Sequence, residues 1–449
     1  MLRYNEGSEN PLEEITKKLE EIFEKSGIKP TSFSQKAGPE GDSGCGDDAN
    51  SGNQGSDAFD PIDKIKSFNL KPVEVKEYLD RFVICQDEAK KVLAVAVCDH
   101  YNHVRSCISN IDKGLRDDEY NKQNILLFGP TGVGKTYLVK TIARLIGVPF
   151  VKADATKFSE TGYVGADVDD LVRDLVKAAN GNIDLAKHGI IFIDEIDKIA
   201  SVSMGESRDI SGRGVQINLL KLMEDTDVNI LSQTDIMNQM RAFVTSSFNK
   251  KNKVDRINTQ HILFIVSGAF DRIVEITNKR LGQAKVGFGG ASRKESVDDF
   301  DVLQQVNTED LIKYGFEPEF IGRLPVRVAC RALGKSELKK ILISSKGSIL
   351  KQYINDFAGY GIKLSVQEDA LEKIAESAEK EKTGARGLLT ILERIFRDFK
   401  FELPSTSVKT LDISADDLAN PDKLLAELMQ KFRSSDVKIY SENFPEKFD

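Results

Sequence analysis

The hydrophobic pattern between residue 61 and about residue 326 alternates between two kinds of segment. Short, nearly continuous apolar runs of strand length are separated by longer stretches with the periodicity of amphipathic helices. Strands that are apolar on both faces indicate a parallel sheet that is covered by helices on each side. The sequence therefore predicts an α/β fold with strands near 124–129, 148–153, 189–195 and 261–268.

The pattern changes on either side of this region. Residues 327–422 carry apolar positions at helical spacing, which predicts a smaller, mostly helical domain, and we assign residues 423–449 to a C-terminal tail. Residues 36–60 are rich in Gly, Ser, Asp and Asn, a composition that predicts a flexible linker. Before this linker, residues 1–35 contain an amphipathic helix at 10–27, which we expect to pack on another surface.

The composition excludes several classes of protein. The chain has 449 residues and a formal net charge of −8, so as a whole it lacks the basic surface typical of nucleic-acid binding. Its longest apolar runs, such as VLAVAVC at 92–98, are shorter than the roughly 18–20 residues that span a bilayer. No secretory signal is visible, and the five cysteines form no CxxC pair. We expect a cytoplasmic protein that binds neither membrane nor nucleic acid.

The segment GPTGVGKT at 129–136 matches the P-loop pattern GxxxxGK[ST] between a predicted strand and a predicted helix. Backbone N–H groups of such a loop surround phosphates, and the helix N-terminus adds a positive potential. Lys135 is expected to reach the β- and γ-phosphates, and Thr136 to offer its hydroxyl to Mg²⁺. We expect the nucleotide to contact Gly129, Pro130, Thr131, Gly132, Val133, Gly134, Lys135, Thr136, Tyr137 and Leu138.

The apolar run IIFI at 190–193 ends on two carboxylates. Asp194 is placed to orient Mg²⁺ through its water shell, and Glu195 to polarise the attacking water. Two carboxylates beside a triphosphate repel it unless a cation is present. The pattern therefore implies Mg²⁺ as a cofactor.

Several blocks follow one another along the chain: GPTGVGKT, TGYVGADVDDLV, IIFIDEIDKIA, RDISGRGVQINLLKLMED, PEFIGRLPV and KTGARGL. Over roughly residues 65–420 this order resembles that of the ClpX family, AAA+ unfoldases that feed the ClpP peptidase. The resemblance implies a homo-hexameric ring that binds ATP between neighbouring subunits, with residues 61–326 as the large ATPase domain. It also implies unfolded or tagged proteins as substrates. The chain itself shows no protease triad, so cleavage would come from the peptidase.

The resemblance also implies roles for individual residues. Arg323 in FIGRLP matches the arginine finger that reaches a neighbour's γ-phosphate, and Arg386 in GARG matches the sensor-2 arginine. Both suit this chemistry, because a guanidinium offers several fixed donors to charge on a phosphoryl group. With Glu195 they form the expected catalytic set, and Arg386 also contacts ATP. Val83 and Ile84 match the family's apolar adenine contacts.

Two loops are expected to contact other proteins. Tyr163 and Val164 lie between glycines and have no obvious core to join. In a ring with a central channel, such an aromatic and aliphatic pair would grip a substrate chain by packing, without reading its sequence. Val286, Gly287 and Phe288 in KVGFGG resemble the tripeptide by which the family docks into hydrophobic clefts on ClpP.

The chain departs from the family in several places. Residues 1–60 contain only Cys45, so we expect the family's four-cysteine zinc domain to be absent and no structural zinc to be bound. The family's Arg-Lys-His loop at the pore entrance is replaced by residues 232–256. Cys85 stands where the family usually has glycine, and Ser267 falls near the expected sensor-1 position.

A group of four residues, Cys98, His100, His103 and Cys107, resembles a metal-binding set at first sight. On a helix His103 and Cys107 share one face, but the other two residues do not join them. We interpret this stretch as an ordinary helix of the nucleotide domain.

Three alternative functions are open at this point. HslU shares the GYVG-type loop, but it carries a large insertion, and only 59 positions (194 − 135) separate Lys135 from Asp194. A protein remodeller without a peptidase is the second alternative, if Val286–Phe288 does not dock. An AAA+ DNA motor or clamp loader is the third, and the net charge opposes it.

Overall fold

The chain divides into two units, residues 1–58 and residues 59–449. The computed structural model describes only parts of the second unit, namely residues 61–112, 122–159, 166–200, 210–230, 256–284, 298–343 and 347–432. Four predicted features lie outside these residues: the N-terminal helix, the linker, the two loops that were expected to contact proteins and nearly all of the 232–256 segment.

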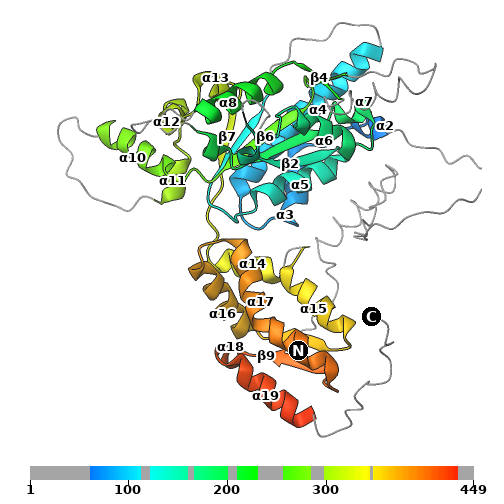
Figure 1. The fold of residues 1–449 in the computed structure, drawn as a ribbon, viewed down its shortest axis with the longest axis vertical. Coiled ribbons are helices and arrows are strands. Elements are labelled where there is room, and N and C mark those ends of the chain that lie inside the picture. The colour runs from blue at the N-terminus through cyan, green and yellow to red at the C-terminus, as the bar shows by residue number, and fades with distance from the viewer. Residues whose placement is uncertain are drawn as a thin grey trace, which may run out of the picture. The chain divides into compact units, whose positions relative to one another are not determined.

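Five parallel strands form the central sheet, in the order β2-β3-β6-β1-β7 (Figure 1). The strand that precedes the P-loop therefore lies inside the sheet, between two strands that come later in the chain. The predicted parallel sheet is confirmed, and the four predicted runs each overlap one of its strands. The strands are β1 (Ile125–Phe128), β2 (Phe150–Asp154), β3 (Ile190–Asp194), β6 (Leu263–Gly268) and β7 (Val326–Ala329).

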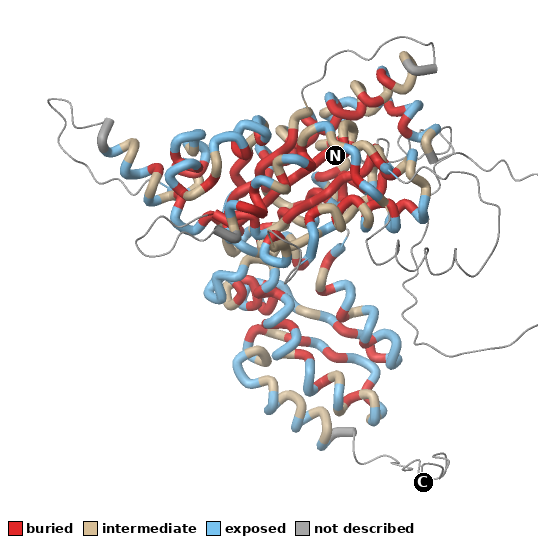
Figure 2. The backbone as a smooth tube through the Cα atoms, turned by 45° about the horizontal axis from the view of Figure 1, so that its top comes forward, coloured by how far each residue is buried: buried red, intermediate tan, exposed pale blue. Residues whose placement is uncertain are grey.

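Successive strand residues point to opposite sides of the sheet, and helices cover both sides. Leu127 and Phe192 belong to one buried cluster, which includes residues of α3, α4 and α5. Leu126 and Ile193 belong to another, which includes residues of α6, α8, α12 and α13. The inner strands β1, β3 and β6 are accordingly the buried centre of this part of the molecule, whereas the edge strand β2 is only half-buried (Figure 2). The helices are α2 (Pro61–Lys66), α3 (Pro72–Asp80), α4 (Asp87–Asp112), α5 (Lys135–Ile146), α6 (Asp170–Ala178), α7 (Ile183–Ala186), α8 (Ile210–Met223), α10 (Ile273–Ala284), α11 (Asp299–Leu303), α12 (Thr308–Tyr314) and α13 (Pro318–Gly322).

The strand β7 was not among the predicted strands. It contains Arg327 and is only half-buried in its first two residues, so it lacks a continuous apolar run. Its backbone nevertheless pairs with β1 along its whole length, from Val326 beside Ile125 to Ala329 beside Phe128. The predicted domain boundary at 326/327 therefore falls inside a strand of the sheet.

The described residues after β7 are mostly helical, with one two-stranded parallel ladder. The helix α19 reaches Phe432, so residues 423–432, which the sequence assigned to the tail, are helical. Within the described residues, no helix combines the length and the apolar character needed to cross a membrane. The elements are α14 (Lys335–Ile343), α15 (Ile349–Gly359), β8 (Lys363–Val366), α16 (Glu368–Lys380), α17 (Ala385–Glu402), β9 (Thr410–Ile413), α18 (Ala415–Ala419) and α19 (Pro421–Phe432).

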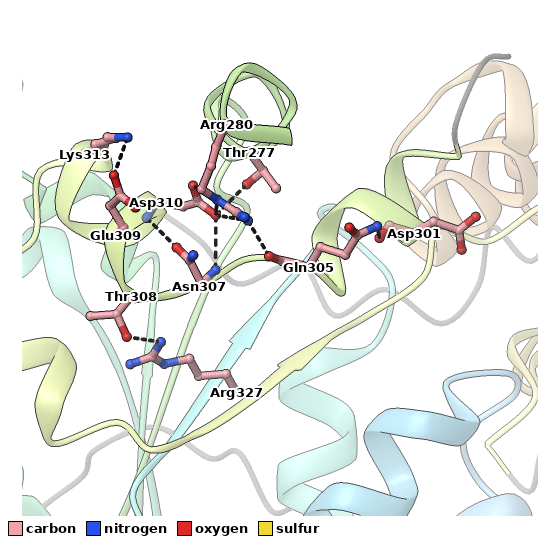
Figure 3. A network of polar contacts seen from close by, with 10 residues as sticks. All are labelled: Thr277, Arg280, Asp301, Gln305, Asn307, Thr308, Glu309, Asp310, Lys313 and Arg327. Atoms are coloured by element: carbon pink, nitrogen blue, oxygen red, sulfur yellow. Dashed lines mark hydrogen bonds and ion pairs between the residues drawn. The ribbon is translucent and has the colours of Figure 1, made fainter. Parts of the chain in front are cut away.

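A buried ion pair joins two of the helices that follow β6 (Figure 3). Asp310 of α12 is fully buried, and the Arg280 guanidinium of α10 donates to both of its carboxylate oxygens at 2.8–3.1 Å. The Thr277 hydroxyl (3.2 Å) and the backbone N–H of Asn307 (3.1 Å) donate to the same carboxylate. The charge on Asp310 is thus compensated by a full set of donors, as a buried charge requires.

Candidate nucleotide site

The P-loop connects β1 to α5, as the sequence predicted. Gly132 and Gly134 adopt φ angles of 76° and 95°, in the left-handed region that favours glycine. The side chain of Lys135 is buried, and its Nζ donates to the carbonyl oxygens of Gly129 (2.6 Å) and Pro130 (2.9 Å). Burial lowers the pKa of Lys135. The loop thereby holds the ammonium group at the N-terminus of α5, which itself attracts anions.

Asp194 ends β3 beside the P-loop. Its Oδ2 accepts a hydrogen bond from Thr136 Oγ1 (3.2 Å) and lies 3.2 Å from Lys152 Nζ. Its Oδ1 accepts from Ser267 Oγ (2.5 Å) and from the backbone N–H of Glu195 (3.1 Å). Burial alone would raise the pKa of Asp194, but the Ser267 hydrogen bond and the Lys152 ammonium outweigh it and lower that pKa. Asp194 is therefore ionised at neutral pH.

Glu195 leaves the strand in a left-handed backbone conformation, with φ 58° and ψ 31°. For a residue other than glycine this conformation costs about 1–2 kcal/mol, and such costs concentrate at functional sites. The 3₁₀ turn η2 (Ile196–Ile199) follows directly and carries the buried Asp197, whose Oδ1 accepts from the backbone N–H of Ala269 at 3.2 Å. Sequence reasoning assigned no role to Asp197, although it lies within the quoted block IIFIDEIDKIA.

These groups line one cavity of about 380 Å³. Two apolar side chains, Ile349 of α15 and Leu389 of α17, line it from the helical region and provide the kind of wall that an aromatic base requires. Among the predicted residues, the cavity is lined by Thr131, Gly132, Gly134, Lys135, Thr136, Tyr137, Asp194, Glu195 and Arg386. The lining residues that were not predicted are Asp197, Lys198, Ala269, Asp271, Ile349, Ala385 and Leu389.

The first turn of α17 meets the P-loop directly and brings Arg386 to the cavity. The backbone N–H of Ala385 donates to the carbonyl oxygen of Gly132 at 2.9 Å. A Cβ atom on Gly132 would lie 2.0 Å from the carbonyl oxygen of Thr383, and one on Gly384 would lie 2.6 Å from that of Gly132. Two glycines therefore permit an approach that no other residue allows.

The segment before α4 contacts the P-loop in a way that was not predicted, because Gln86 Nε2 donates to the carbonyl oxygen of Val133 at 3.5 Å. Val83 is buried in the core, and neither Val83 nor Ile84 is among the residues that line the cavity. Cys85 has φ 62°, which gives a physical reason why glycine suits this position. The buried Gln86 donates to the carbonyl oxygen of Arg331 (2.7 Å) and accepts from its N–H (2.8 Å).

Arg323 does not line the cavity of its own chain. It caps α13 on the surface, where its half-exposed guanidinium forms an ion pair of 2.6 Å with Glu224. Four of the predicted P-loop contacts are not among the residues that line the cavity, namely Gly129, Pro130, Val133 and Leu138. The other predicted residues, Tyr163, Val164, Val286, Gly287 and Phe288, lie outside the described residues.

The sheet, the P-loop and the carboxylates at the end of β3 define a P-loop ATPase of the AAA class. Residues 120–327 match the family model of the AAA domain (Cdc48 subfamily), and residues 333–403 match that of the C-terminal, D2-small domain of ClpB protein. The predicted fold class is confirmed. The AAA domain also implies that the chain binds ATP.

Curated relatives identify the family more closely. The chain is 42% identical over 352 residues to the ATP-dependent Clp protease ATP-binding subunit ClpX of Borrelia duttonii, which covers 78% of each chain. The Borrelia recurrentis protein of the same name gives the same values, and that of Bacteroides fragilis is 41% identical over 349 residues, or 77% of this chain and 80% of its own. The chain belongs to the ClpX family, and it is an AAA ATPase.

Proposed function

We propose that the chain assembles into a homo-hexameric ring that uses ATP to unfold proteins and passes them to a ClpP-type peptidase. One observation carries this proposal. The cavity is lined jointly by the P-loop and by α17, so a bound nucleotide contacts both the sheet and the helical region. Hydrolysis changes those contacts and so moves one region relative to the other. Membership of the ClpX family directs this movement to protein substrates.

ATP is bound in this proposal by Gly129–Leu138, with Lys135 pairing with the β- and γ-phosphates. Thr136 and Asp194 would hold Mg²⁺, since their side-chain oxygens lie 3.2 Å apart and are the hard donors that this ion prefers. When bound, Mg²⁺ neutralises charge on the phosphates. The assignment of Val83 and Ile84 to the adenine rests on the family resemblance. Ile349 and Leu389 line the cavity itself.

The hydrolytic step is assigned to three residues. Glu195 is exposed on the cavity wall and positioned to take a proton from the attacking water. Arg386 contacts the phosphates from α17 and reports their state to the helical region. Arg323, which lies away from its own cavity, stabilises the γ-phosphate in the neighbouring subunit.

Tyr163 and Val164 are proposed to grip the substrate in the pore. The residues on either side of their loop are bonded to each other, because the N–H of Ala166 donates to the carbonyl oxygen of Lys157 at 3.0 Å and Phe158 and Ala166 form a β-bridge. The strand that leads into this stem is β2, whose Lys152 pairs with Asp194. A change in charge at the nucleotide can therefore be transmitted to the loop through the single strand β2.

Val286, Gly287 and Phe288 are proposed to dock on the peptidase. They lie between α10 and α11, and α10 is tied to α12 by the ion pair of Arg280 and Asp310. This ion pair gives the segment a fixed base on the α10 side.

The test is to mix the full chain with a ClpP-type peptidase, ATP and a tagged fluorescent protein. We expect ATP-dependent loss of fluorescence, followed by degradation of the reporter.

Two variants test the two loops separately. Phe288→Ala should keep hydrolysis and unfolding but lose degradation, and Tyr163→Ala should keep hydrolysis but lose most unfolding. An active ATPase that leaves the reporter folded would contradict the proposal. Unfolding without degradation would indicate a remodeller, and stimulation of the ATPase by duplex DNA would indicate a DNA motor.

A further inference from the structure

The four histidines of the chain gather at one edge of the sheet, opposite the nucleotide site. His188 lies two residues before β3 and His261 two residues before β6, whereas Asp194 and Ser267 lie at or near the far ends of the same parallel strands. A strand of five or six residues spans about 16–20 Å. This cluster is therefore remote from the ATPase chemistry.

Three side chains of this cluster have the composition and the spacing of a metal site. Cys107 Sγ lies 3.1 Å from His103 Nε2, and the ligand atoms of His103, Cys107 and His261 all lie within 4.8 Å of one another. The ring centroids of His103 and His261 are 6.1 Å apart, and those of His188 and His261 are 5.7 Å apart. His103 and Cys107 are four residues apart on helix α4, and His261 belongs to a turn that is distant in the sequence.

The surrounding contacts hold the set in place. His100, on the same helix α4, hydrogen-bonds through Nε2 to the carbonyl oxygen of His261 at 3.1 Å. Tyr101 is fully buried and donates its hydroxyl to the carbonyl oxygen of His188 at 3.0 Å. Both turns that carry histidines are thus hydrogen-bonded to α4. These bonds to the backbone help to fix the positions of His103, Cys107 and His261 relative to one another.

We propose that His103, Cys107 and His261 bind a divalent transition-metal ion of the zinc class. Imidazole nitrogen and thiolate sulfur are the donors that zinc prefers, whereas Mg²⁺ takes oxygen. Zinc bonds of about 2.1 Å to nitrogen and about 2.3 Å to sulfur separate tetrahedral ligands by about 3.5 Å, so side-chain shifts of about 1 Å close the set. Cys107 loses its thiol proton to solvent on binding, and water completes the fourth position.

Such an ion would connect α4 to the turn before β6, two segments that are about 150 residues apart in the chain (261 − 107 = 154). A ligand that binds only the folded chain raises its stability by mass action. The metal is therefore a structural cross-link in the ATPase domain and has no part in hydrolysis. His103 and His261 are half-buried, which leaves the ion a route from solvent, while Cys107 is buried.

The experiment uses the full chain without a histidine tag, freed of metal by a chelator and then given Zn²⁺ or Co²⁺ alone. We expect one Zn²⁺ per chain by elemental analysis, a higher unfolding temperature, and with Co²⁺ the charge-transfer absorption of a cobalt–thiolate bond. Cys107→Ala should abolish the absorption and the rise in unfolding temperature. Cys98→Ala is the matched control, because Cys98 is a buried cysteine of the same helix outside the set, and it should keep both.

ATP hydrolysis at the opposite edge checks that each variant is folded, and Cys107→Ala should retain it. If Cys107→Ala does not fold, His261→Gln decides, because this half-exposed residue supplies another ligand. A wild-type chain that takes up no Zn²⁺ would overturn the proposal. So would a folded Cys107→Ala or His261→Gln variant that binds Co²⁺ with the same absorption as the wild type, since the set would then be only a hydrogen-bonded cluster.

Discussion

The left-handed turn at Glu195 separates the roles of two adjacent carboxylates. Asp194 is the last residue of β3 and is held by Thr136, Ser267 and Lys152. Glu195 makes no such set of contacts and is exposed on the cavity wall. Asp194 is therefore held in place as an ionised partner for a cation, and Glu195 is free to exchange a proton with water.

Replacing Glu195 by Gln tests this separation of roles, because it removes the carboxylate and keeps the size of the side chain. We expect ATP to bind with nearly wild-type affinity, because the P-loop and Asp194 are unchanged, and to be hydrolysed about 10²–10⁴-fold more slowly. Equilibrium nucleotide binding and steady-state phosphate release measure the two effects. Glu275→Gln, at an exposed site outside the cavity, is the control and should hydrolyse normally. Near-normal turnover in Glu195→Gln would show that another residue activates the water.

The elements α10 and α12 depend on a single buried charge. Asp310 has no exposed surface, and burial by itself would raise its pKa, but hydrogen bonds from Arg280 and the backbone of Asn307 outweigh burial and lower that pKa. Because the folded pKa is lowered, the stabilising contribution is complete above the ordinary carboxyl value of about 4. It is lost as the pH falls through the lowered value.

Removing the guanidinium with Arg280→Ala leaves Asp310 buried without an opposite charge, with only the Thr277 hydroxyl and the backbone N–H of Asn307 as donors. We expect the free energy of unfolding to fall by about 3 kcal/mol at pH 7, measured by chemical denaturation. The difference from the wild type should shrink as the pH falls toward 4, because Asp310 then takes up a proton in the variant.

The control for this experiment is the exposed ion pair of Lys313 and Glu309 on the same helix α12 (Figure 3). Lys313→Ala should cost no more than about 0.5 kcal/mol, because exposed pairs are screened by solvent. Equal losses in the two variants would mean that the buried pair does not hold these helices together.

The assembled molecule is needed for the proposed chemistry, because Arg323 lies on the surface, away from the cavity of its own chain. A head-to-tail ring joins the cavity of one subunit to a different surface of the next. Each active interface would then require Glu195 from one subunit and Arg323 from its neighbour.

Mixing two inactive variants tests this arrangement. Arg323→Ala subunits keep an intact cavity, and Glu195→Gln subunits keep an intact arginine. In rings assembled from equal amounts, about one interface in four combines both intact halves, so we expect up to about a quarter of the wild-type hydrolysis rate. Each variant alone should be nearly inactive. A mixture no more active than the sum of its parts would place Arg323 outside the neighbour's site.

The sequence by itself predicted the strands that carry the site and the residues within or beside its short motifs. Lys135, Thr136, Asp194 and Glu195 belong to this group, because a few consecutive residues determine both the local backbone and the positions of these side chains. Arg386 became recognisable only through the order of motifs along the chain. The strand β7 was missed, because backbone pairing with β1 rather than its own apolar pattern puts it in the sheet.

Only the tertiary structure decided which distant segments meet. The apolar wall of Ile349 and Leu389, the support of Gln86 and the set of His103, Cys107 and His261 join residues far apart in the chain. No spacing in the sequence records such contacts, because they depend on how helices pack across a sheet and not on the periodicity of any one element. Local patterns therefore specified the elements and the motifs of the nucleotide site, and packing specified its walls and the cluster at the opposite edge.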